Sequence, residues 1–261
     1  MTRSKTFRLL AAAVVAIAML ATTTIGAFEQ QKQSRGITNI VFVHGAWADG
    51  SSWSKVIPLL AAKGLHVVAV QLSHRSLADN VATVQRAIAL VDGPLLLVAH
   101  SFGGVVITEA GNDPKVAGLV YVAAQAPVEG QSAFDLANAY PTPIGQELQL
   151  DQFGFLKVTP TGIREVFAPD LSDSEQTVLT ATQTPTAVEA LSAPVSTAAW
   201  RSKPCWFVIT ADDRVVSPAL QAMEAQQMNA TSITVSSSHV VMLSQPGVVA
   251  SFIRKAAREL R

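Results

Sequence analysis

Cysteine and charge are both scarce in this chain of 261 residues. Cys205 is the only cysteine, so no disulfide can form within the chain. Charged residues make up 15% of the sequence and the formal net charge is zero, which leaves no basic stripe and no acidic tail. We therefore expect no nucleic-acid partner. No spacing of His, Cys, Asp and Glu is typical of a metal site, and we expect neither a metal nor another cofactor.

Apolar residues are abundant instead, at 49% of the sequence. This composition suits a large core whose strands are covered on both faces. The length fits one α/β domain with an insertion, or two small domains.

The first 27 residues have the pattern of an export signal. Basic residues precede an uninterrupted apolar run at 9–21, which is shorter than the roughly 20 residues of a membrane span. Small residues at 22–27 would allow cleavage after position 27. We predict a signal peptide at 1–27, a polar linker at 28–36, and export to the periplasm or the extracellular space. An N-terminal anchor that stays uncleaved is the alternative.

From residue 37 to the end, short apolar runs alternate with helical patterns. The predicted strands are 37–43, 66–70, 95–99, 116–122, 205–209 and 232–235. The predicted helices are 53–63, 77–91, 105–110, 218–228 and 246–260. This alternation is typical of a parallel sheet with right-handed crossovers. We predict one α/β domain at 37–261 with a mainly parallel, six-stranded sheet and helices on both faces.

One long segment interrupts this alternation. Between Ala124 and Trp200 no strand-like run is evident, and seven prolines separate short helical stretches. A segment of this length is an inserted element rather than a connection. We predict a helical cap at about 125–200, over the carboxyl edge of the sheet, where ligands bind in open α/β folds.

A sharp turn joins the strand 95–99 to the helix that follows it. Ser101 lies at the apex of this turn, and the positions two before and two after it, Ala99 and Gly103, are small. We expect small residues there because the end of the strand and the first helical turn nearly touch. The pattern predicts a nucleophilic Ser101 in strained backbone geometry at the positive end of a helix. The alternative is that Ser101 merely caps the helix.

A serine hydroxyl needs a base within hydrogen-bond reach, and the base needs an acid to orient it. Both residue types follow predicted strands. Asp212 and Asp213 come after the strand 205–209, and His239 follows the last strand. The carboxyl ends of parallel strands share one edge of the sheet, so these side chains can meet Ser101.

The chain resembles the α/β-hydrolase superfamily, within it the compact group of plant hydroxynitrile lyases, plant esterases of small methyl esters and their bacterial relatives. The resemblance covers about 37–260. It rests on four motifs in the order of that family: His44-Gly45-Ala46-Trp47, Ala99-His100-Ser101-Phe102-Gly103-Gly104, Asp212-Asp213-Arg214 and His239.

The resemblance implies roles for particular residues. Asp213 is the expected acid, because the family's acid lies a few residues before a proline that opens the next helix; Asp212 is then a solvated turn residue. The backbone N–H groups of Phe102 and Ala46 are the expected oxyanion donors. Trp47 and Gln125 are expected to line the acyl pocket.

The expected activity is that of an exported serine carboxylesterase, in which Ser101, His239 and Asp213 cleave small, apolar or aromatic esters through an acyl-enzyme. Two alternatives stay open. One is a non-catalytic small-molecule binder on the same fold. The other is a hydroxynitrile-lyase-like enzyme, against which Val240 and Gly45 stand where the lyases carry Lys and Thr.

Overall fold

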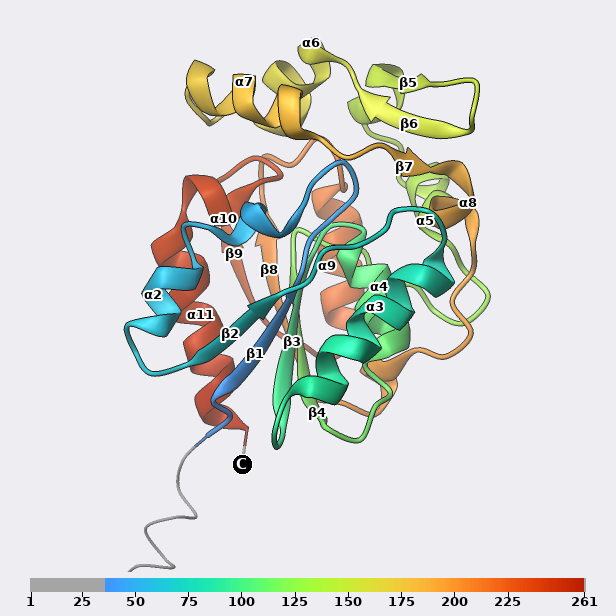
Figure 1. Ribbon diagram of the computed structural model, residues 1–261. Coiled ribbons are helices and arrows are strands. Elements are labelled where there is room, and N and C mark those ends of the chain that lie inside the picture. The colour runs from blue at the N-terminus through green and yellow to red at the C-terminus, as the bar shows by residue number, and fades with distance from the viewer. Residues whose placement is uncertain (1–35, 261) are drawn as a thin grey trace, which may run out of the picture. The chain divides into compact units, whose positions relative to one another are not determined.

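The computed structural model describes residues 36–260, and Ile37–Leu260 form one compact unit. The predicted export signal and residues 28–35 of the predicted linker lie outside the described residues. The main sheet has the strand order β2-β1-β3-β4-β8-β9, and every neighbouring pair is parallel (Figure 1). Its strands are β1 (Asn39–Val43), β2 (His66–Ala69), β3 (Leu95–His100), β4 (Val116–Val122), β8 (Cys205–Thr210) and β9 (Thr231–Val235). The predicted six-stranded parallel sheet is confirmed.

Helices cover both faces of this sheet. The crossover helices are α2 (Ile57–Ala61), α3 (Leu77–Leu90), α4 (Gly103–Ala110), α9 (Pro218–Gln227) and α11 (Pro246–Glu259), with a 3₁₀ turn η1 (Gly50–Trp53) and a short α10 (Val241–Ser244). Helices α2 and α11 pack together on one face, and α3 and α4 pack together on the other (Figure 1). The central strand β3 is buried at every residue, as its apolar run predicts.

The predicted helix at 53–63 is divided in the structure. Asp49 accepts a hydrogen bond from the Ser51 N–H and caps η1, and the α-helix begins only at Ile57. Pro58 occupies the first turn of α2, where its missing N–H removes no helical hydrogen bond. The proline therefore marks a helix start within the predicted segment.

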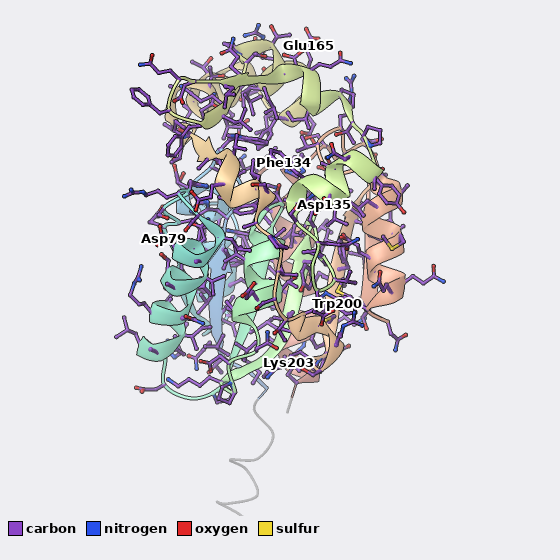
Figure 2. All side chains as sticks on the ribbon, turned by 90° about the vertical axis from the view of Figure 1, so that its right-hand side faces the viewer. Asp79, Phe134, Asp135, Glu165, Trp200 and Lys203 are labelled. Carbon is purple, nitrogen blue, oxygen red and sulfur yellow. The ribbon has the colours of Figure 1, made fainter. Side chains whose placement is uncertain are left out.

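The insertion after β4 lies over the carboxyl edge of the main sheet, as predicted (Figure 1). Its helical segments are α5 (Ala133–Ala139), η2 (Pro143–Glu147), α6 (Pro160–Gly162), a π-helical turn η3 (Ile163–Phe167), α7 (Asp173–Thr182), α8 (Val188–Ser192) and η4 (Ala199–Arg201). Figure 2 places Phe134 of α5 between the main sheet and the outer part of the insertion, where Glu165 lies.

The insertion also contains a small antiparallel sheet that the sequence analysis missed. It has the order β5-β6-β7, with β5 at Leu148–Leu150, β6 at Phe155–Val158 and β7 at Thr186–Ala187. Strands of two to four residues are too short to show a periodic pattern, which explains why no strand was expected between 124 and 200.

A buried carboxyl group holds the start of the insertion. Glu224 on α9 is 2% exposed, and its Oε1 accepts a hydrogen bond of 2.8 Å from the N–H of Ala126. Its Oε2 is buried and has no hydrogen-bond partner among residues 36–260. Burial raises the pKa of Glu224 to about 8 from its ordinary value of 4.5, so the neutral acid is the form that suits this site.

Replacing Gly103 by alanine is expected to destabilise the fold. An added Cβ would lie 2.6 Å from the carbonyl oxygen of His44 and 2.8 Å from that of Val43, and backbone atoms cannot yield as a flexible side chain can. We expect Gly103→Ala to lower the free energy of unfolding by roughly 1–3 kcal/mol, measured by urea denaturation. Gly145→Ala is the matched control, because no atom lies within 4 Å of its added Cβ. Equal losses in the two variants would contradict this reading of Gly103.

The raised pKa of Glu224 predicts how stability changes with pH. The folded-state pKa lies above the unfolded-state value, so the stability that the neutral acid contributes is fully present below about pH 4.5 and is lost as the pH rises toward about 8. In urea titrations at several pH values, Glu224→Gln should gain stability relative to wild type by up to roughly 1.4 kcal/mol per pH unit across this window. Parallel stability curves for the two proteins would contradict the prediction.

Candidate active site

Ser101 lies at the apex of the turn between β3 and α4. Its φ angle is 54°, in the left-handed region that a non-glycine residue adopts rarely. The Ser101 N–H donates to the carbonyl of Val122 on the neighbouring strand β4, and the residue is 5% exposed. Strand, strained apex and helix therefore follow each other as the sequence predicts.

At Gly103 the nearest obstacle to a side chain is the backbone at the end of β1. The carbonyl oxygens of Val43 and His44 leave no room there for an added Cβ. Gly45, in the turn after β1, has the same constraint from the other side: an added Cβ would lie 2.7 Å from the Cβ of Ser101. The two turns thus meet at the glycines.

Asp213 follows β8 and is 5% exposed. Its Oδ1 accepts from the N–H groups of Val215 and Val216 at 2.8 and 3.0 Å, and its Oδ2 accepts from Thr210 Oγ1 and Gln221 Nε2, both at 2.9 Å. Five donors, including the histidine described next, surround this carboxylate and fix its orientation. The neighbouring Asp212 is exposed and accepts from Ser236 Oγ at 2.7 Å.

His239 lies in the loop between β9 and α10 and is completely buried. Its Nδ1 lies 2.9 Å from Asp213 Oδ2. Because a carboxylate only accepts, Nδ1 carries the proton and Nε2 presents its lone pair. The structure therefore brings His239 to Asp213 and not to Asp212. Nε2 has no hydrogen-bond partner among residues 36–260, and no hydrogen bond joins it to Ser101 Oγ there.

A second imidazole packs against this one. The ring centroids of His100 and His239 are 4.4 Å apart, and His100 Nε2 donates to the backbone carbonyl of His239 at 3.0 Å. Burial, with a smaller contribution from His239, holds the pKa of His100 well below its ordinary value. His100 is thus a neutral packing partner that holds the backbone of His239.

Two backbone N–H groups next to Ser101 are free to bind an anion. Neither the N–H of Ala46 nor that of Phe102 donates to any group within residues 36–260. Ala46 belongs to the turn after β1, and Phe102 is the N-cap residue of α4. The sequence predicts these two N–H groups as oxyanion donors, and the structure leaves both without an acceptor within residues 36–260.

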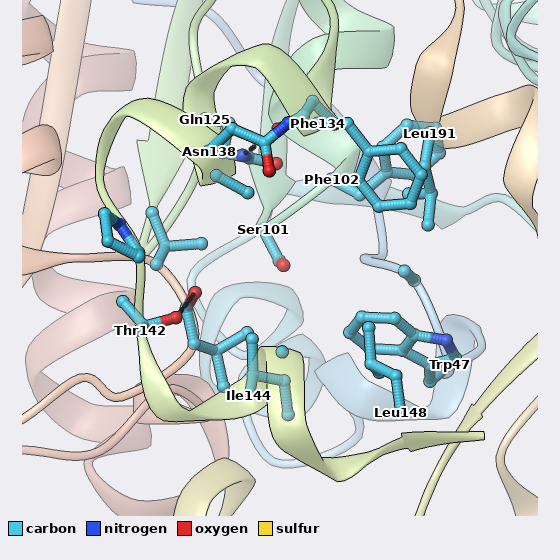
Figure 3. Close-up of a pocket in the computed structure, with 17 residues that line it drawn as sticks. Trp47, Ser101, Phe102, Gln125, Phe134, Asn138, Thr142, Ile144, Leu148 and Leu191 are labelled. Atoms are coloured by element: carbon cyan, nitrogen blue, oxygen red, sulfur yellow. Dashed lines mark hydrogen bonds between the residues drawn. The ribbon is translucent and has the colours of Figure 1, made fainter.

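Ser101 opens into a cavity of about 270 Å³ (Figure 3). Apart from Ser101, the lining residues that carry polar side chains are Gln125, Asn138 and Thr142, and no charged residue takes part. The apolar lining comprises Ala46, Trp47, Phe102, Ala133, Phe134, Ala137, Pro141, Ile144, Leu148, Leu191, Val215 and Val216, together with Gly145. Trp47 and Gln125 are both part of this wall, where the sequence analysis expected them. His239 and Asp213 do not line it.

The insertion holds Trp47 in place. The Trp47 N–H donates to Thr186 Oγ1 at 3.1 Å, and the indole Nε1 donates to the carbonyl of Leu156 at 3.0 Å. The φ angle of Trp47 is 58°, and its indole packs edge-on against Phe167 with centroids 6.5 Å apart. The turn after β1 is therefore attached to strands β6 and β7 of the insertion.

Two other histidines support this turn. His44 Nε2 accepts from the Leu72 N–H at 3.0 Å, and His74 bridges Thr186 Oγ1 and the carbonyl of Ala48. Burial lowers the pKa of His44 to about 4 and also lowers that of His74. Both rings are therefore neutral, and they connect this turn to the segments that carry Leu72 and Thr186.

Residues of the insertion that the sequence analysis missed hold the loop of His239. Asp170 accepts hydrogen bonds from the N–H and the hydroxyl of Ser238 and from Ser237 Oγ. These bonds hold the pKa of Asp170 below its ordinary value, against the opposing effect of its partial burial. Phe167 packs edge-on against the imidazole, with centroids 5.1 Å apart. Three consecutive serines before His239 were the only sequence signal, and they do not identify their partner.

No cluster of three or more metal-ligating side chains is present within the described part of the chain. None of the helices within residues 36–260 combines the length and the apolar composition that a membrane span requires.

Comparison with known proteins places this geometry in a wider group. The pattern of the alpha/beta hydrolase family matches residues 40–252. A pyrethroid hydrolase of Sphingobium wenxiniae is 36% identical over 101 residues, which are 34% of this chain and 36% of that protein. The chain therefore matches only about a third of the length of this relative.

Solved structures match over most of the chain. A pyrethroid hydrolase from Sphingobium faniae superposes with a TM-score of 0.74 at 23% identity, covering 85% of this chain and 97% of that one. Polyneuridine aldehyde esterase superposes with a TM-score of 0.75 at 20% identity, covering 84% of this chain and 99% of that one. Tomato methylketone synthase I, solved with 2-tridecanone, superposes with a TM-score of 0.76 at 17% identity, covering 86% of this chain and 99% of that one. At these identities the superpositions show the fold, and the family pattern spans most of the sequence. The chain belongs to the alpha/beta hydrolase family.

Proposed function

We propose that this protein is a serine carboxylesterase in which Ser101 is the nucleophile, His239 the general base and Asp213 the group that orients it. The observation that carries the proposal is the buried hydrogen bond of 2.9 Å between His239 Nδ1 and Asp213 Oδ2. This bond leaves Nε2 as a proton acceptor at the sheet edge where Ser101 occupies its strained apex. The relatives named as hydrolases and esterases support this reading.

In the proposed reaction, Ser101 Oγ attacks the ester carbonyl while its proton moves to His239 Nε2. The oxyanion of the tetrahedral intermediate accepts from the N–H groups of Ala46 and Phe102, each worth roughly 3–4 kcal/mol. The same proton then passes to the leaving alcohol as the acyl-enzyme forms, and water repeats the sequence to release the acid. Catalytic hydrogen bonds are often completed only with substrate bound, which accounts for the unpaired Nε2 in the free protein.

The cavity supports a small, uncharged substrate. Its wall is mainly apolar and carries no charged side chain, so an ionised acyl group would lose its hydration there without gaining a partner. Trp47, Phe102 and Phe134 provide aromatic faces against which a ring or a short alkyl chain can pack. We therefore propose small apolar or aromatic esters as the substrate class.

Gly45 favours a hydrolase over a hydroxynitrile lyase. The lyases carry a threonine at this position, yet an added Cβ here would lie 2.7 Å from the Cβ of Ser101 and 3.1 Å from His100 Nδ1. A hydroxyl-bearing side chain has no room beside the nucleophile. We also propose export of the protein, on the strength of the apolar run at 9–21.

Ser101→Ala is expected to lower kcat/KM for a short-chain nitrophenyl ester by roughly 10⁴-fold, because the nucleophile is lost while the fold remains. The wild-type protein should also gain one adduct mass with a fluorophosphonate, and the variant should gain none. Ser192→Ala, which alters an exposed serine, is the control and should behave as wild type in both assays. Near-normal turnover by Ser101→Ala would refute the assignment.

The two adjacent aspartates provide a matched pair for the orienting acid. Asp213→Asn should lower kcat by roughly 10³–10⁴-fold, because the amide no longer selects the tautomer with a free Nε2 lone pair. Asp212→Asn should change kcat little, because its carboxylate contacts only Ser236 Oγ among residues 36–260. The kcat of each variant is measured in steady-state assays, and circular dichroism verifies that each variant is folded. Similar losses in the two variants would remove Asp213 from the proposed role.

A further inference from the structure

One polar side chain lies deep in the apolar wall of the Ser101 cavity. Gln125 follows β4, is 8% exposed, and its backbone N–H donates to the carbonyl of Ser101. The side chains of Gln125 and Ser101 line the same cavity (Figure 3). A buried amide at this position needs hydrogen-bond partners for both of its ends.

The protein satisfies only one end of this amide. Gln125 Nε2 donates to the carbonyl of Ala133 at 3.0 Å, and only the NH₂ end can face a carbonyl oxygen. This bond fixes the orientation of the amide. Its Oε1 lies on the side of Ser101 and the cavity (Figure 3) and accepts no hydrogen bond within residues 36–260.

Thr142, on the opposite part of the wall, presents the same chemistry. Its hydroxyl donates to the carbonyl of Val215 at 2.9 Å, so its only hydrogen is already used. Toward the cavity this oxygen can only accept. Gln125 Oε1 and Thr142 Oγ1 thus both offer lone pairs to a ligand, and the Thr142 hydroxyl has no hydrogen left to donate. The NH₂ group of Gln125 is turned toward the carbonyl of Ala133.

The cavity is treated as the place of the acyl half of the ester. In the proposed reaction that half lies against the wall formed with Ser101 by Trp47 and Phe102, while the leaving alcohol takes its proton from His239.

Resting on the proposed esterase function, we propose that this protein selects esters whose acyl group carries a hydrogen-bond donor, a hydroxyl or an N–H, which is bound by Gln125 Oε1 with Thr142 Oγ1 as a second acceptor. An acyl group without a donor would bury these oxygens unpaired. Sites built to bind a substrate hydroxyl discriminate strongly against the analogue that lacks it.

The test compares nitrophenyl esters of phenylacetic acid, mandelic acid, and 3- and 4-hydroxyphenylacetic acid. For each ester, kcat/KM is divided by its rate of uncatalysed hydrolysis. Wild type should prefer at least one hydroxylated ester over phenylacetate by roughly tenfold or more. Equal or poorer turnover of all three hydroxylated esters would overturn the proposal.

The variants assign this preference to its residues. The measured quantity is the ratio of the corrected kcat/KM of the preferred hydroxylated ester to that of the phenylacetate ester. Gln125→Met keeps the length of the side chain, and it should bring this ratio close to one while the phenylacetate ester is still turned over. Thr142→Val should lower the ratio severalfold, and it decides the matter by itself if Gln125→Met does not fold. Asn138→Leu is the matched control, since this amide lines the same cavity from an exposed position, and the ratio should persist. An unchanged ratio in Gln125→Met, or its loss in Asn138→Leu, contradicts the assignment.

A binding measurement separates this proposal from the proposed function. Calorimetry with Ser101→Ala compares phenylacetone with 1-hydroxy-1-phenylacetone and with 3- and 4-hydroxyphenylacetone, neutral ketones that cannot be hydrolysed. Roughly tenfold tighter binding of at least one hydroxyketone, lost in the Ser101→Ala/Gln125→Met double variant, supports the donor site even if no ester is turned over. Affinities of Ser101→Ala for all three hydroxyketones that are no higher than for phenylacetone contradict it, whatever the esterase assays show.

Discussion

Two backbone turns approach each other closely at the carboxyl edge of the main sheet, and Ser101 lies where they meet. The turn after β1 and the turn after β3 meet because Gly45 and Gly103 have no side chains between them. Strands β1 and β3 are neighbours in the parallel sheet, so both turns emerge at the same edge. Their contact brings Gly45 next to Ser101, and the N–H groups of Ala46 and Phe102 belong to the same two turns. The position of Ser101 relative to these two N–H groups therefore depends on one packing contact.

The imidazole of His239 is held at the same edge of the main sheet by a different set of contacts. His239 stands in a loop without regular structure, and its position depends on contacts from several elements. Asp213 holds Nδ1, His100 holds the backbone carbonyl, and Phe167 packs on the ring. Asp170 binds the preceding serines from the insertion. The insertion thus takes part in holding His239 as well as in forming the wall of the cavity.

The sequence predicts most of the features that depend on strand ends. The apolar runs located all six strands of the main sheet, and each predicted site residue follows one of them, since parallel order brings such residues to one edge. Contacts between segments that are distant in the sequence produce no periodic pattern from which they could be predicted. Asp170 could not be identified because its partners lie more than sixty positions away. The reason for a small residue at Gly103 also required coordinates, because its neighbour belongs to β1 and not to the adjoining strand.

The two hydrogen bonds that attach Trp47 to the insertion differ in how they constrain substitution. The acceptor at Leu156 is a backbone oxygen, which any amino acid supplies, so position 156 can change without loss of the bond. The acceptor at Thr186 is a side-chain hydroxyl, which among the aliphatic residues only serine shares. A substitution at 156 therefore leaves this acceptor in place, whereas a substitution at 186 removes the acceptor unless the new side chain also presents an oxygen.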